Sequence, residues 1–395
     1  MTRQPICRGF KAAGVAAGLK KNGKPDLAMI FSEVPATVAG VFTRNKVQAA
    51  PVRYDRERIK SGRCQAVIVN SGNANCCTGP QGDAHAATMA RIAAARLGID
   101  ANLVLVASTG VIGEPLPIEK LDAAAPGLVK SLRPDGIPGF AEAIMTTDTV
   151  PKIAFKEGRV GDKPFAILGV AKGAGMIHPD MATMLCFICT DVDISADMLQ
   201  SALNSAVRHT FNRITIDGDT STNDTLLILA SGLSGVHISD SEALRHFQPL
   251  LDDVCLQLAK MLVKDGEGAT KLVEIQVKGA RSAQDAHRIA NTIAGSNLVK
   301  TAFFGEDANW GRILGAAGRA DVPIDPDRID VFFNDVQMVK AGVGCGKAVE
   351  AEATRVLKTP EFTVTVDLHL GDKSDSVFTC DFSLDYVRIN ADYRS

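Results

Sequence analysis

Short apolar segments rich in β-branched residues alternate with longer amphipathic stretches along the chain, and this alternation limits the folds open to it. The short segments have the length and composition of strands and lie at 66–70, 103–108, 165–172, 225–231, 271–277 and 362–370. The longer stretches show helical periodicity with Ala, Leu or Met on one face and lie at 83–99, 195–211, 241–266 and 285–305. The pattern predicts an α/β or α+β fold.

The composition is that of an ordinary globular protein. The chain has 395 residues, of which 46% are hydrophobic and 22% charged, and its length suggests about two or three domains. Its 43 Lys and Arg nearly balance its 45 Asp and Glu, so no net field steers it toward nucleic acid or an anionic membrane. Small molecules and other subunits are the expected partners. The stretch 132–140, which contains Pro and Gly, is the best candidate for a linker.

Cysteine usage and the N-terminal residues indicate the compartment. The nine cysteines are scattered rather than arranged as a disulfide framework. No window approaches the roughly 18 apolar residues of a membrane span, and residues 1–14 lack the apolar core of a signal peptide. We therefore expect a cytoplasmic protein. Cys186 and Cys189 have CxxC spacing, but they lie in an apolar run without a second pair or an adjoining His, and we expect no metal there.

The segment 172–191, KGAGMIHPDMATMLCFICTD, is the most unusual part of the chain. A strand ends in a glycine turn, a polar loop follows, and Ala182 precedes a Thr that opens another apolar strand. Thr183 can act as a nucleophile if its nitrogen becomes a free amine, since an α-amino group with a pKa of about 7.7 to 8 can accept the hydroxyl proton. Glycines and Pro179 before it could impose the strain that such a cut requires. On the local sequence alone, an ordinary strand residue at Thr183 remains the stronger alternative.

The whole segment is very similar to the autoprocessing site of the ornithine acetyltransferase family, also called the bifunctional glutamate N-acetyltransferase family. The similarity continues in order through GFKAAGVAAGLK, VAGVFTRNKVQAAPV, AVIVNSGNANCCTG, VLVASTGVIGEPLP, MTTDT, FNRITIDGDTSTNDT, DGEGATK, AFFGEDANWGRI and INADYRS. Many long motifs in one order are highly specific. The resemblance implies the α/β, self-cleaving threonine-nucleophile fold of the ornithine acetyltransferase/DmpA-like type, with mixed sheets flanked by helices in two domains.

The same resemblance implies a cut between Ala182 and Thr183. It would leave an α chain of 1–182, which carries the oxyanion site, and a β chain of 183–395, which begins with the nucleophile and ends in a substrate-binding C-terminus. Two α and two β chains would form a heterotetramer. Thr183 would carry acetyl in a ping-pong transfer from N2-acetylornithine to glutamate. The family requires no cofactor or metal, and acetyl-CoA is a candidate co-substrate in its bifunctional members.

The family's functional residues have counterparts in this chain. The oxyanion position maps onto Thr109 and Gly110, where a glycine turn after a strand offers a hydroxyl and an N–H group to negative charge. The substrate-binding positions that carry over are Thr147, Lys172, Thr183, Glu267, Asn390 and Ser395. A carboxylate such as Glu267 suits the ammonium of ornithine, and a cation such as Lys172 suits a carboxylate. Ser395 replaces the family's usual terminal Thr but keeps its hydroxyl. Without the resemblance, each would be an ordinary turn or strand-end residue.

Other patterns in the sequence give weaker indications of function. The glycines at 173 and 175 lack the third glycine of a dinucleotide loop, and 342–349 lacks the first glycine and the Ser or Thr of a phosphate loop, which predicts a glycine-rich turn. The carboxylates of 217–224 do not follow a calcium-loop pattern and are expected in a polar loop near the site. The Asn and Gly cluster 70–75 suits turns with positive φ, and whether it lines the pocket stays open.

Two rival functions share these features. A self-cleaving aminopeptidase or amidase would use the same Thr183 chemistry with water as the acceptor. A non-catalytic binding or assembly protein would keep the fold without being cut. The amino-acid pocket distinguishes the first rival from a transferase, and an intact chain mass distinguishes the second.

Overall fold

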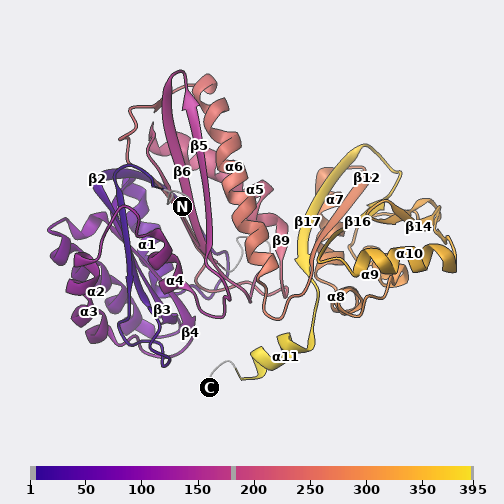
Figure 1. The fold of residues 1–395 in the computed structure, drawn as a ribbon, viewed down its shortest axis with the longest axis horizontal. Helices are drawn as coiled ribbons and strands as arrows, with labels where there is room; N and C mark the ends of the chain where they lie inside the picture. Colours follow the sequence, from indigo (N-terminus) through magenta and orange to yellow (C-terminus); the bar gives the residue numbers. More distant parts are fainter. Residues whose placement is uncertain (1–5, 179–183, 393–395) are drawn as a thin grey trace. The chain divides into compact units, whose positions relative to one another are not determined.

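A computed structural model describes residues 6–178 and 184–392 as two compact units. The first unit contains the described residues of 1–173, 180–212 and 219–262, and the second those of 174–179, 213–218 and 263–395. Figure 1 shows the elements along the chain. These spatial units are a different division from the expected α and β chains, because each is built from segments on both sides of position 182.

The first unit is organised around a mixed eight-stranded sheet. Its order is β4-β3-β2-β10-β7-β6-β5, with β1 paired to β2. The strands are β1 (Phe10–Val15), β2 (Leu27–Phe42), β3 (Arg63–Asn73), β4 (Val104–Val111), β5 (Lys152–Val160), β6 (Lys163–Lys172), β7 (Leu185–Thr190) and β10 (Thr225–Ala230). Only β3 with β4 and β7 with β10 are parallel among these strands of the described chain. A two-stranded sheet joins β8 (Asp193–Ile194) to β11 (His237–Ile238).

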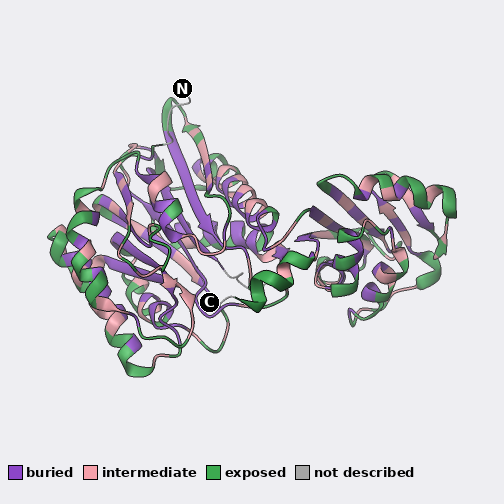
Figure 2. Ribbon diagram, turned by 60° about the horizontal axis from the view of Figure 1, so that its bottom comes forward, coloured by how far each residue is buried: buried purple, intermediate pink, exposed green. Residues whose placement is uncertain are grey.

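Helices cover both faces of this sheet. They are α1 (Ala50–Arg58), α2 (Gly79–Leu97), α3 (Ile118–Lys130), α4 (Ile137–Ile144), α5 (Ala196–His209) and most of α6 (Ser241–Lys264). Successive residues of β3 point to opposite faces: Val67 and Val69 enter one core with α4, while Ala66 and Ile68 enter the other with α2. Burial on both faces explains the continuous apolar run of this strand, and Figure 2 shows the strands buried beneath helices with exposed outer faces.

The second unit contains a seven-stranded sheet in the order β15-β14-β13-β16-β12-β17-β9. Its strands are β9 (Ile214–Thr215), β12 (Leu272–Ala280), β13 (Asp330–Phe333), β14 (Val336–Lys340), β15 (Val343–Gly344), β16 (Glu361–Asp367) and β17 (Lys373–Cys380). Its helices are α7 (Ala283–Ala294), α8 (Asn297–Phe304), α9 (Trp310–Gly318), α10 (Lys347–Leu357) and α11 (Leu384–Ala391). Val273, Ile275 and Val277 of β12 are buried in one core with α7, which is the alternation of a sheet covered on one face.

The structure confirms the α/β class and all six predicted strands, and it also contains elements that the sequence did not predict. The stretch 285–305 is two helices rather than one, because Gly295 is the C-cap of α7 and Ser296 is the N-cap of α8. The long strand β2 is missing from the sequence prediction. Its register shifts between Phe31 and Ala36, where Pro35 interrupts the apolar pattern, and proline is tolerated within a sheet at such a bulge.

The prediction of a linker at 132–140 is wrong. Arg133 and Ala12 exchange backbone hydrogen bonds of 2.9 and 3.2 Å, and a Cβ atom at Gly136 would lie 1.8 Å from the Ala12 carbonyl oxygen. Ile137 and Phe140 are buried in α4. The Pro and Gly residues therefore make a tight turn packed on β1 inside the first unit.

Among residues 6–178 and 184–392, none of the helices combines the length and the apolar character needed to cross a bilayer.

Phe140 of α4 gives a test of this packing. Its ring is fully buried and lies edge-on to Phe187 of β7, with the ring centroids 5.4 Å apart. We expect Phe140→Ala to lower the free energy of unfolding by about 3 to 5 kcal/mol through the cavity it leaves, measured by urea denaturation followed by circular dichroism. Val47→Ala, at a side chain that is 52% exposed, is the control and should change it by less than about 0.5 kcal/mol. Equal effects would contradict this packing.

Candidate functional site

Lys172, the last residue of β6, lies at the centre of the polar groups of the first unit. It is buried, and its Nζ donates to Thr146 Oγ1 at 2.8 Å and to Thr109 Oγ1 at 3.2 Å. Thr109 lies near the end of β4, and Thr146 in the turn between α4 and β5. The structure thus brings together two residues that the resemblance singles out, Thr109 and Lys172, although they are far apart in the sequence.

These contacts determine the direction of the Thr109 hydroxyl. A lysine ammonium is only a donor, so Thr109 Oγ1 must accept from Lys172, and its own hydrogen is left to donate elsewhere. The nearby positive charge also makes that hydrogen a stronger donor. A hydroxyl held in this way can stabilise a developing oxyanion, which is the role implied for Thr109.

Asp148 holds Lys172 in place, and sequence reasoning missed it. Its buried carboxylate accepts from Lys152 Nζ at 2.7 Å, from Gly173 N at 2.6 Å and from Thr146 N at 3.0 Å, and lies 3.9 Å from Lys172 Nζ. Burial raises the pKa of Asp148, but the ammonium groups of Lys172 and Lys152 lower it by a larger amount. The resulting pKa is about 2. The carboxylate is therefore ionised, and it fixes both lysines and the start of the glycine turn.

Thr147 lies between these contacts. It is half-buried in the turn, flanked by Thr146 and Asp148, which both face Lys172. This position is compatible with the substrate-binding role that the resemblance implies for it.

Gly110 is placed by a close approach of two backbones. Its φ is +134°, and a Cβ atom there would lie 2.3 Å from the carbonyl carbon of Gly72. Gly72, at the end of β3, itself has φ +97°. A side chain at Gly110 would therefore push β3 and β4 apart just after Thr109.

An amide network fixes the same strand end. Asn223 Nδ2 donates to Ala74 O at 2.7 Å and to Ser108 O at 2.8 Å, and Ser108 Oγ donates to Asn70 Oδ1 at 2.6 Å. Asn70 and Asn223 are buried, so these bonds are made without competition from water. The Asn and Gly cluster 70–75 thus supports the strand that carries Thr109, an assignment that spacing could not make.

Glu267 and Asn390 come together in the second unit. Asn390 Nδ2, on α11, donates to Glu267 Oε2 at 2.8 Å, and Glu267 is 7% exposed. A Cβ atom at Gly175 would lie 2.5 Å from the same oxygen, so a side chain there would displace this carboxylate. Asn390 leaves the other carboxylate oxygen, Oε1, to a further donor.

Asp217 anchors the segment that precedes position 179. Its carboxylate accepts from Met176 N at 2.5 Å and from Ile177 N at 2.8 Å, and Tyr386 OH donates to it at 3.3 Å. Met176 has φ +57°, which is unfavourable for a residue with a side chain and costs on the order of 1 kcal/mol. The carboxylate thus holds an otherwise unfavourable backbone, and Asp217 serves this structure rather than a calcium loop.

The predicted cut at Ala182 and Thr183, and the terminal Ser395, lie outside the described residues. The description resumes at Met184, whose N–H donates to Asp224 Oδ1 at 3.0 Å. Burial raises the pKa of Asp224 well above its usual value. Asp224 therefore fixes the start of β7 from within the core, and it belongs to a different unit from Asp217.

The remaining patterns are structural. Cys186 and Cys189 are buried in β7, and burial raises the pKa of each thiol. The segment 342–349 forms β15 and the start of α10. Among the described residues, no group of three or more His, Cys, Asp or Glu side chains is placed to hold a metal ion.

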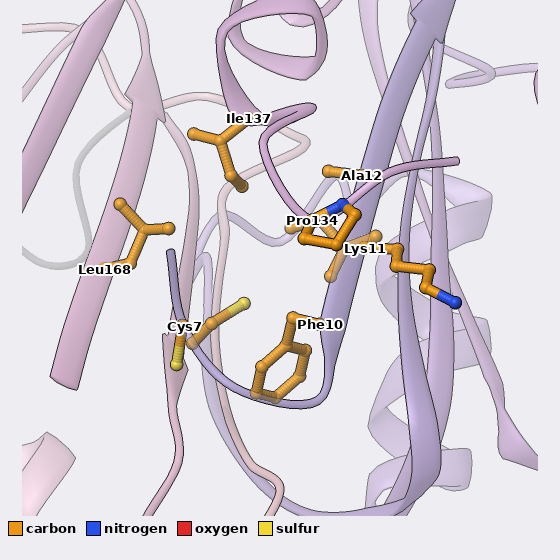
Figure 3. Close-up of a pocket in the computed structure, with 9 residues that line it drawn as sticks. Cys7, Phe10, Lys11, Ala12, Pro134, Ile137 and Leu168 are labelled. Atoms are coloured by element: carbon orange, nitrogen blue, oxygen red, sulfur yellow. The ribbon is translucent and has the colours of Figure 1, made fainter. Parts of the chain in front are cut away.

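Figure 3 shows a narrow pocket in the first unit. It is lined by Cys7, Phe10, Lys11, Ala12, Ile30, Pro134, Ile137, Leu168 and Cys189. The ammonium of Lys11 points away from it (Figure 3) and pairs with Glu33 at 2.8 Å. Its lining is thus almost wholly apolar and includes none of the site residues named above.

Comparison with known proteins gives one consistent result. The sequence pattern of the ArgJ family matches residues 11–395. The "Arginine biosynthesis bifunctional protein ArgJ" of Syntrophotalea carbinolica is 54% identical over 98% of this chain and 99% of its own, and that of Geobacter sulfurreducens is 53% identical over the same shares. A crystal structure of the protein of that name from Bacillus halodurans is 42% identical, with a TM-score of 0.50, and covers 52% of this chain and 97% of the crystallised chain.

The pKa of Asp148 predicts a pH dependence of stability. Because its folded pKa of about 2 lies below the unfolded value of about 3.9, the stabilisation is complete above pH 5 and is lost as the pH falls toward 2. Asp148→Asn removes the carboxylate that accepts from the buried Lys152 ammonium at 2.7 Å and should lower the free energy of unfolding by about 3 to 5 kcal/mol at pH 7. The difference in the free energy of unfolding between wild type and Asp148→Asn should become smaller by about 2 kcal/mol as the pH is lowered from 6 to 2.

Urea denaturation at several pH values measures this effect. Asp162→Asn, at an exposed turn between β5 and β6, serves as the control and should track the wild type throughout. A constant difference between wild type and Asp148→Asn over the whole range would show that Asp148 is not the ionised partner of the two lysines.

Proposed function

The chain belongs to the ArgJ family, and from this premise we propose that it is a glutamate N-acetyltransferase that moves acetyl from N2-acetylornithine to glutamate in arginine biosynthesis. The observation that carries the proposal is the family match over residues 11–395, with relatives above 50% identity across nearly their full length. The contact between Lys172 and Thr109, and that between Glu267 and Asn390, support it from the structure.

The nucleophile in this proposal is Thr183, made by a cut after Ala182. The matched crystallised chain of Bacillus halodurans is only about half as long as this one, which is the length expected for one product of such a cut. The backbone held by Asp217 at Met176, six residues before the cut, is consistent with a segment kept out of its relaxed conformation.

The transfer proceeds in two balanced halves. The Thr183 hydroxyl attacks the acetyl carbonyl of N2-acetylornithine while its own α-amine takes the hydroxyl proton. The tetrahedral intermediate collapses, the C–N bond breaks, and the proton passes to the departing amine of ornithine. The neutral amine of glutamate then attacks the acetyl ester and gives one proton to the α-amine of Thr183, and the Thr183 oxygen takes that proton from the α-amine as the C–O bond breaks.

Thr109 and Gly110 stabilise the negative charge of each tetrahedral intermediate. The Thr109 hydroxyl is oriented to donate because it accepts from Lys172. Gly110 supplies an N–H group from a backbone that tolerates no side chain. The groups are fixed before the reaction, so little reorganisation is needed when charge develops.

The substrate groups are assigned by charge. Lys172 and Thr147 receive the α-carboxylate common to donor and acceptor, because an ammonium and a hydroxyl are donors to carboxylate. Glu267, held by Asn390, receives the side-chain ammonium of ornithine. Ser395 completes the set with its hydroxyl.

Further features of the proposal follow the family. Acetyl-CoA is a second acetyl donor, in keeping with the bifunctional names of the relatives, and neither a metal nor another cofactor is required. The α and β chains assemble as an α2β2 heterotetramer in the cytoplasm.

The mass of the freshly purified protein tests the cut. We expect two fragments that break after Ala182 in the wild type and one chain of 41.7 kDa in Thr183→Ala, because only the wild type has the attacking hydroxyl. Denaturing mass spectrometry measures both. An unbroken wild-type chain would remove the free amine from the mechanism and favour a non-catalytic binding protein.

The oxyanion role of Thr109 is tested with a variant of the same shape. Thr109→Val removes the hydroxyl and should lower kcat by about 100 to 1,000-fold, the usual effect of losing one oxyanion donor. Thr109→Ser keeps the hydroxyl and should retain most of the activity. Rates are compared on cut protein only, and similar rates for the Val and Ser variants would exclude the hydroxyl from the reaction.

A further inference from the structure

A second lysine, Lys20, belongs to a loop that is tied down by one buried carboxylate. Asp26 is fully buried and accepts from the backbone N–H groups of Ala17, Leu19 and Lys20 at 2.6, 2.6 and 2.8 Å. The N–H of Ser71 donates to the Asp26 carbonyl at 2.9 Å. The backbone of Lys20 is therefore fixed against the end of β3, and its side chain leaves the loop from a defined point.

The aliphatic stem of Lys20 lies against Gly72 near the end of β3. A Cβ atom at Gly72 would lie 3.3 Å from Lys20 Cγ, and one at Gly110 would lie 2.3 Å from the backbone of Gly72. Lys20 thus contacts the residue of β3 that Gly110, next to Thr109, approaches.

The ammonium of Lys20 lies at the end of α4. Its Nζ donates to Pro25 O at 2.8 Å and to Ala143 O at 3.4 Å. Ala143 is three residues before Thr146, which contacts Lys172. Lys20 is therefore held at the last turn of α4, and Lys172 at the turn that follows this helix.

Lys20 has no carboxylate partner of its own. Across residues 6–178 and 184–392, no Asp or Glu oxygen lies within ion-pair distance of its Nζ, whose two acceptors are backbone carbonyls. The third N–H of the ammonium is left for another acceptor. Burial and, to a smaller extent, the ammonium of Lys172 lower the pKa of Lys20 to about 8, against the opposing effect of Asp26. An anion bound here would relieve the repulsion between the two ammonium groups.

We propose that Lys20 selects glutamate as the acceptor by binding its side-chain carboxylate, while Lys172 binds the α-carboxylate. This inference rests on the proposed function. Glutamate carries two carboxylates and the donor N2-acetylornithine only one, so a second cation beside Lys172 distinguishes the acceptor by charge. In the donor half of the reaction Lys20 has no carboxylate to bind, and Glu267 takes the side-chain ammonium instead.

Selectivity between glutamate and glutamine tests the proposal. The two acceptors have the same shape, but only glutamate has the side-chain charge. In the wild type, kcat/KM should favour glutamate by at least about 10 to 100-fold, the effect of one charge-assisted hydrogen bond. Lys20→Met should lower kcat/KM for glutamate by a similar factor and leave that for glutamine nearly unchanged.

Two controls separate charge from structure. Lys20→Arg keeps the charge and should keep most of the preference. Lys24→Met removes an exposed lysine of the same loop and should change kcat/KM for neither glutamate nor glutamine. Ornithine release and acetyl-enzyme formation from N2-acetylornithine, followed by mass spectrometry, should be nearly unaffected in Lys20→Met, because the donor half does not use this residue.

The outcomes separate the two hypotheses. A wild-type enzyme that forms no acetyl-enzyme overturns the proposed function itself. A wild type that forms the acetyl-enzyme but does not prefer glutamate over glutamine overturns the role of Lys20. A Lys20→Met enzyme whose kcat/KM falls equally for both acceptors also overturns it. If Lys20→Met does not fold, the same ratio is measured with Lys20→Gln and in the wild type, where the preference alone can contradict the proposal.

Discussion

The position of the Lys172 ammonium depends on one buried carboxylate, that of Asp148. Asp148 contacts Lys152, the N–H of Gly173 and the turn of Thr146 at the same time. A buried charge pair of this kind contributes little net stability, because desolvation offsets most of the attraction, whereas losing one partner is costly. Its main effect is on geometry: Lys172 is held against Thr109, and the hydroxyl needed for the reaction is oriented before any substrate arrives.

Space for the backbone is the second constraint. Gly110 must approach Gly72, and Gly175 must leave room for the carboxylate of Glu267. These glycines lie in different units, but the physical reason is the same, since a Cβ atom would enter the space of a backbone or of a functional group. Glycine occupies these positions because there is little space for a Cβ atom, and not only because of its conformational freedom. Gly175, unlike Gly110, has no positive φ.

Carboxylates that are buried or half-buried recur as backbone anchors. Asp26 accepts three N–H groups of one loop, Asp217 accepts two beside Met176, and Asp224 accepts the N–H of Met184. Each compensates for polar groups that a turn leaves without partners. The last two hold the described chain on either side of the expected cut, which gives the carboxylates of 217–224 a structural function.

The sequence by itself determined the α/β class, the six strands and the family, because apolar periodicity and long ordered motifs are local properties. It also indicated Thr109, Lys172, Glu267 and Asn390 through the resemblance. Only the tertiary structure decided that Asp148 lies beside Lys172, that Lys20 reaches the end of α4, and that 132–140 packs on β1 rather than linking domains. The physical reason is that hydrogen bonds, desolvation and backbone clearance depend on contacts between segments distant in the chain, about which local patterns carry no information.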